Sequence, residues 1–180
     1  FLGLDNIGCF DRSAPLPTGG FINQADGTSW MAMYSLNLMR IALELAQHNP
    51  VYEDIATKFF EHFLHIAEAM AARGGGGVSL WDDADEFFYD ALHLPHGEAI
   101  PLKVRSMVGL LPLCAATVFE GQVMAKYPEL TERLQWFLTS RPELYAAIHD
   151  PTTIGVNGRR LASILDETKL RRVLSKMLDE

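Results

Sequence analysis

Two acidic segments near the N-terminus contain side chains that could take part in catalysis. Residues 3–12 read Gly-Leu-Asp-Asn-Ile-Gly-Cys-Phe-Asp-Arg, which places Asp5 and Asn6 between two glycines. A carboxyl group on a loop at the mouth of a cavity can give or accept a proton during a reaction. The alternative is turn chemistry, because Asp and Asn are common in turns and Asp11 could pair with Arg12.

The second acidic segment, residues 24–31, reads Gln-Ala-Asp-Gly-Thr-Ser-Trp-Met and contains Asp26 and Trp30. Trp30 and Trp81 are candidates for the walls of a sugar pocket, since aromatic faces cover the C–H side of a pyranose. Packing in a core is an equally good interpretation of Trp30. Arg105 precedes an apolar segment, where it either faces a cavity or helps to cap a helix.

Metal-binding signals are weak. His62 and His65 are three residues apart within a helical pattern, but they do not form the His-Glu-x-x-His arrangement of zinc proteases. The acidic residues at 82–86 lack the glycine and the final glutamate of a calcium-binding loop. We interpret both groups as solvated surface, and we expect no metal and no cofactor.

These residues must be positioned by helices, for the most part. Residues 29–47 are apolar nearly all round, which predicts a helix buried on most faces. A second, amphipathic helix begins after Asn49, a good N-cap, with Pro50 at its first position. Residues 87–93 and 100–104 predict a small β-hairpin. Further helical segments are expected at 107–119, 127–138, 142–148 and from Asp166 to Leu178.

The segments alternate between all-round apolar and amphipathic, and the pair repeats after about eighty residues. Two concentric layers of helices, as in an α/α toroid, would produce this pattern. A simple helical bundle or a solenoid is the competing explanation, because the helical pattern by itself does not choose between them.

Residues 1–11, residues 24–31, and Trp81 together with residues 88–90 resemble glycoside hydrolase family 63, most closely its large bacterial and fungal members. Family 37 trehalases share the same plan. The resemblance implies an all-α fold, part of an (α/α)6 toroid with a small β-hairpin insertion. It also implies hydrolysis with inversion, and it makes residues 1–180 a single partial catalytic domain.

In such an enzyme one carboxylic acid protonates the leaving oxygen and a second carboxylate activates water on the opposite face of the sugar. The resemblance matches Asp5 to the general acid and Asp26 to an aspartate close to the bound sugar. Asn6, Trp30, Trp81 and Arg105 complete the expected substrate-binding set. The general base of the family is a glutamate much later in the chain, and these 180 residues show no convincing counterpart.

The composition of the chain argues against two classes of binding partner, nucleic acids and membranes. The formal net charge of −8 argues against nucleic acid, and no apolar segment is long and pure enough to span a membrane. Two widely spaced cysteines, Cys9 and Cys114, favour a reducing compartment and hence the cytoplasm; Cys114 is expected to be buried. The chain starts at Phe1 and ends within a helical pattern, which predicts a fragment that packs against the remainder of its parent chain.

We therefore expect an inverting glycosidase whose substrate is an oligosaccharide or small glycoside with an α-linked glucose or mannose. The isolated fragment should be inactive, because part of the toroid would be missing. The alternatives are a non-catalytic carbohydrate-binding protein and a helical scaffold or interaction module.

Overall fold

The fold mixes helices with short strands. A computed structural model describes residues 14, 16, 17, 19–71, 78–122 and 126–179. Within those residues the chain forms five α-helices and three small sheets, with 52% helix and 15% strand. The expected all-α class is therefore wrong, and with it the assignment to part of an (α/α)6 toroid. Asp5 and Asn6 lie outside the described residues.

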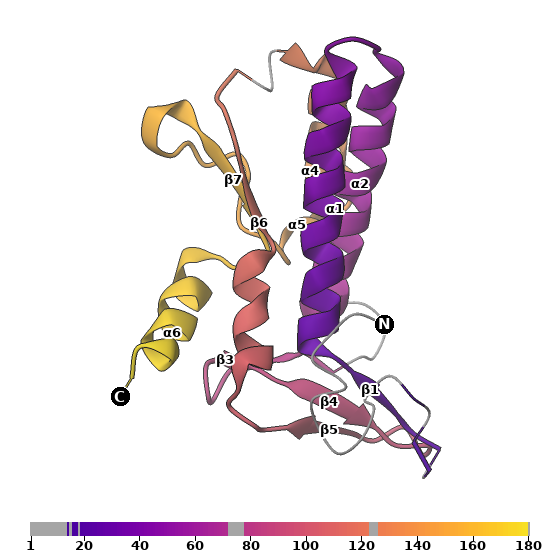
Figure 1. Ribbon diagram of the computed structural model, residues 1–180, viewed down its shortest axis with the longest axis vertical. Helices are drawn as coiled ribbons and strands as arrows, with labels where there is room; N and C mark the ends of the chain where they lie inside the picture. The colour runs from indigo at the N-terminus through magenta and orange to yellow at the C-terminus, as the bar shows by residue number, and fades with distance from the viewer. Residues whose placement is uncertain (1–13, 15, 18, 72–77, 123–125, 180) are drawn as a thin grey trace.

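Two long antiparallel helices run along one side of the molecule (Figure 1). Helix α1 spans Ala25–Ala46 and helix α2 spans Val51–Ala71. Both helices contribute to the core through Leu36, Met39, Phe60 and Phe63, none of which is more than 4% exposed. The cap expected for α2 is confirmed, because the Asn49 side chain accepts a hydrogen bond from the Val51 amide at 3.2 Å.

A three-stranded antiparallel sheet lies at one end of this helix pair (Figure 1). Its strands are β1 (Phe21–Asn23), β4 (Asp90–His93) and β5 (Ala99–Leu102), in the order β1-β4-β5. The predicted hairpin is thus confirmed as β4–β5. Strands β2 (Trp81–Asp82) and β3 (Phe87–Phe88) pair separately.

The apolar segment 107–119 is not the helix that its composition suggested. Residues Met107–Cys114 form a short 3-10 helix, η2, and Ala116–Phe119 form strand β6. The segment is so uniformly apolar that it has no helical period, and Pro112 lacks the amide that a longer α-helix needs. Strand β6 pairs with β7 (Arg160–Ser163), far along the chain. Cys114 is exposed, contrary to expectation.

The C-terminal part contains α4 (Pro128–Ser140), the short α5 (Pro142–Tyr145), the 3-10 turn η3 (Val156–Gly158) and α6 (Glu167–Met177). Helix α4 packs on α2, and α6 contacts β3 and η2. The predicted cap of the last helix is confirmed, since Asp166 Oδ1 accepts a hydrogen bond from the Lys169 amide at 2.8 Å.

The layered arrangement expected of α1 also needs correction. An inner-layer helix would be buried on both sides, whereas in the described part of the chain α1 packs mainly against α2, η2 and β6. Several large apolar side chains on its other side remain exposed. Within the described residues, only one half of this all-round apolar helix is covered.

Candidate functional site

The candidate site lies where strand β1 runs directly into helix α1 (Figure 1). Gln24 connects the two elements in an extended conformation at the N-cap position, and its side chain makes no capping hydrogen bond. The first amides of a helix have no partner within the helix, so they need acceptors from elsewhere. Acidic side chains near this junction can supply those acceptors.

Asp90 supplies one of these acceptors from the neighbouring strand. The Ala25 amide donates to Asp90 Oδ1 at 2.7 Å across a separation of 65 residues, and the bond is buried. Asp90 reaches this position because it is the first residue of β4, next to β1 in the sheet. The bond brings segment 24–31 together with segment 88–90, two of the stretches on which the expectation of family 63 was based.

Asp26 lies one residue further into the helix and is fully buried. Its Oδ1 accepts a hydrogen bond from the Gly27 amide at 2.8 Å. Because the N-terminal end of a helix is electropositive, both carboxylates occupy a position that favours negative charge, by up to about 2 kcal/mol each in partly buried geometries. With no exposed surface, Asp26 can bind a sugar only after local opening.

A polar pair at the same sheet was missed by sequence reasoning. Asn23 Nδ2 lies 2.9 Å from His93 Nε2, and the Phe21 ring stacks on the His93 ring with centroids 4.6 Å apart. Residues 21 and 93 are directly opposite in the register of β1 and β4. Only a correct pairing of these two strands, which are far apart in sequence, would have predicted this contact.

Trp81 and Arg105 belong to a different cluster, around the β2–β3 turn. Trp81 Nε1 donates to Asp83 at 2.9 Å, and its ring packs edge-on against Phe88. Arg105 lies 3.7 Å from Asp85 in an exposed ion pair. The pKa of Arg105 is raised, and the largest cause is a hydrogen bond to the Tyr89 side chain.

The same turn holds a tighter ion pair. Lys103 Nζ lies 2.7 Å from Asp82 and 3.1 Å from Asp85. The hydrogen bond from Lys103 lowers the pKa of Asp82 from its ordinary value of 3.8. Among the described residues, no group of His, Cys, Asp and Glu is arranged to hold a metal ion. The acidic turn is thus neutralised by basic side chains of its own chain.

Trp30 is half-buried on α1 and stacks on Tyr34, with ring centroids 6.1 Å apart. Of the residues expected at the site, Asp26 and Trp30 share the first turns of α1, whereas Trp81 and Arg105 lie with the acidic turn. Asp90, which the resemblance included but which we did not select as a site residue, is the residue that links strand and helix.

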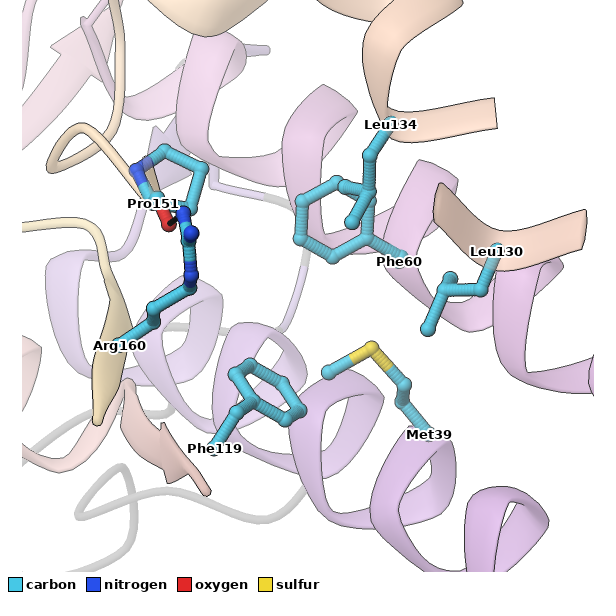
Figure 2. Close-up of a pocket in the computed structure, with 7 residues that line it drawn as sticks. All are labelled: Met39, Phe60, Phe119, Leu130, Leu134, Pro151 and Arg160. Atoms are coloured by element: carbon cyan, nitrogen blue, oxygen red, sulfur yellow. Dashed lines mark hydrogen bonds between the residues drawn. The ribbon is translucent and has the colours of Figure 1, made fainter. Parts of the chain in front are cut away.

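A separate apolar pocket lies between α1, α2, α4 and the β6–β7 pair (Figure 2). Met39, Phe60, Phe119, Leu130 and Leu134 form most of its lining. Arg160 closes one side and donates to the Pro151 carbonyl at 3.3 Å. None of the lining residues is a carboxylate, so this pocket has no group for acid–base cleavage of a glycoside.

The chain is similar to one curated protein of much greater length. It is 44% identical over 192 aligned residues to the uncharacterized protein YMR196W of Saccharomyces cerevisiae. The alignment covers the whole of this chain and 18% of the yeast protein. No known family model matches the chain, and no solved structure matches it. In the described part of the chain, every helix is too short or too polar to cross a membrane.

Proposed function

We propose that this chain contributes the general-acid half of the active site of an inverting glycoside hydrolase that acts on an α-linked glucoside or mannoside. The observation that carries the proposal is the buried bond between Asp90 and the Ala25 amide. It joins two of the segments that resemble family 63, which are otherwise remote in sequence. The proposal rests on these residues and not on a toroidal fold.

In the proposed reaction, Asp5 is the proton donor. Its carboxylic acid protonates the glycosidic oxygen as the bond to the anomeric carbon breaks, and water adds from the opposite face with inversion. Asp26, which is buried in the structure, holds a sugar hydroxyl near the reacting carbon once the start of α1 has opened locally. The base that takes the proton from water comes from the complete polypeptide outside residues 1–180, so the isolated chain should not turn over substrate.

The test uses the complete polypeptide that contains this chain, with α-linked glucose and mannose disaccharides as substrates, because their poor leaving groups need the proton of a general acid. We expect Asp5→Asn to reduce kcat by about 100- to 10,000-fold, the range for a lost general acid, because an amide cannot donate that proton. Asp11→Asn, in the same segment, is the matched control and should keep nearly full activity.

The stereochemistry of the product gives an independent readout. Proton NMR of the first sugar released should show the β-anomer, since an inverting enzyme converts an α-linkage into a β-product. Full activity of Asp5→Asn, or release of the α-anomer, would refute the proposal. Sugar binding without any product from the wild-type polypeptide would favour a carbohydrate-binding protein instead.

A further inference from the structure

Helix α1 carries a second apolar face, which the described part of the chain leaves uncovered. Met31, Tyr34, Leu38, Ile41 and Leu45 are each between 37% and 55% exposed. We call these five residues the α1 stripe. Their spacing of three and four residues makes one continuous line about 21 Å long on the helix surface.

The α1 stripe lies opposite the face that packs in the core. At about 100° per residue, Leu38 and Ile41 project roughly 140–160° away from the buried Leu36. No residue of the stripe is charged, and Arg40 is the single basic residue of α1. A lipid surface would call for several Lys or Arg beside the apolar face, so the composition favours another apolar helix as the partner.

The size of the α1 stripe argues against a second copy of this chain as that partner. At about 200 Å² for each large side chain, the exposed fractions correspond to an apolar surface on the order of 450 Å². A stable interface between separate proteins buries about 800 Å² on each partner. A segment of the same polypeptide needs less, because its effective concentration is high and no free partner has to be immobilised.

The yeast relative shows that such additional chain exists in a similar protein. This chain matches 18% of it, so most of its length lies outside the matched region. We infer that the α1 stripe is the docking surface for an apolar helix of the same polypeptide, contributed from outside residues 1–180. Helix α1 then lies between that helix and α2.

The experiment places a photocrosslinker on the α1 stripe in the complete polypeptide. Ile41→p-benzoylphenylalanine places the probe outside the described core, so these residues should still fold, and Lys58→p-benzoylphenylalanine is the control on an exposed part of α2. After irradiation at low protein concentration, we expect a product of monomer mass from the position-41 variant. Peptide mass spectrometry should join residue 41 to a segment outside residues 1–180.

Three results would overturn the inference. They are a product of dimer mass, a crosslink to another part of residues 1–180, and a yield at position 41 no higher than that at position 58. Because the measurement requires neither substrate nor turnover, its outcome is independent of the proposed glycosidase activity.

Discussion

Asp90 acts at the scale of a single residue, by accepting the first amide of α1 from a strand 65 residues away. We expect Asp90→Ala to lower the free energy of unfolding by about 1–3 kcal/mol, because it leaves a buried donor without its acceptor. Asp83→Ala, at an exposed carboxylate, should change stability by less than about 0.5 kcal/mol. Urea denaturation followed by circular dichroism measures both variants.

Asp90→Asn separates the hydrogen bond from the charge. The amide oxygen can still accept from the Ala25 amide, so this variant should keep more stability than Asp90→Ala. Equal losses for the Asn and Ala variants would mean that the negative charge at the helix end dominates. A stability of Asp90→Ala equal to that of the wild type would contradict the role assigned to the bond.

The Lys103–Asp82 pair allows a titration test. The lowered pKa of Asp82 depends chiefly on the hydrogen bond from Lys103, so Lys103→Gln should move that pKa back towards 3.8. Carboxyl-detected NMR titration measures the shift. Because the folded-state pKa lies below the unfolded value, the pair stabilises the fold above pH 3.8, and this stabilisation is lost as the pH falls through the lowered pKa. An unchanged Asp82 titration in the variant would exclude Lys103 as the cause.

Local caps could be predicted from sequence, whereas distant ones could not. Asn49 and Asp166 precede their helices by a residue or two, so the residue type and its position already indicate the bond. Asp90 acts across 65 residues, and only the pairing of β1 with β4 brings it to α1. For the same reason, residues 88–90 were among the stretches compared with family 63, but no role for Asp90 was predicted from them.

At the scale of elements, a hydrogen bond from Tyr127 connects the start of α4 with the end of α1. Its buried hydroxyl donates to the Leu43 carbonyl at 2.6 Å. Leu43 is in the last turn of α1, where carbonyls have no partner within the helix. Burial, with smaller contributions from Glu44 and Glu53, raises the pKa of Tyr127 above 10.0. The phenol therefore stays protonated at neutral pH, as a donor must.

Tyr127→Phe should destabilise the protein by about 1–2 kcal/mol, since the ring is kept and only the hydrogen bond is lost. Thermal or chemical denaturation measures the loss. Tyr52→Phe, at a Tyr that is 36% exposed on α2, is the matched control and should be nearly neutral. In the wild type the raised pKa makes the contribution of Tyr127 complete below pH 10.0, and it is lost as the pH rises through the folded-state pKa. A neutral Tyr127→Phe would contradict this role.

Helices with a clear period and the β4–β5 hairpin were predicted well, whereas the other short elements were not. Residues 51–71 alternate apolar and polar positions at helical spacing, and α2 has those bounds almost as expected. Residues 107–119 are nearly all apolar, so their pattern contains no period that separates helix from strand. Their division into η2 and β6 depends on β7, which starts some forty residues later.

At the scale of the whole molecule, the burial pattern of α1 was predictable only in part. The sequence indicates a helix that is apolar all round, and the structure buries the side that faces α2 and η2. The α1 stripe remains, and the proposed intramolecular partner accounts for it. The class of fold was mispredicted because three small sheets, each of only two or three short strands, give weak sequence signals.

The pairing of β6 with β7 has a consequence for how this chain is made. Ala116 lies opposite Ser163, so the ladder closes a loop that contains all of α4 and α5. Contacts between such distant residues form late, because the entropy of closing the loop must be overcome first. During synthesis the hairpin of α1 and α2 emerges from the ribosome well before β7 exists. Strand β6 therefore has no strand partner until β7 has been made, and an unpaired strand at that stage favours aggregation of the nascent chain.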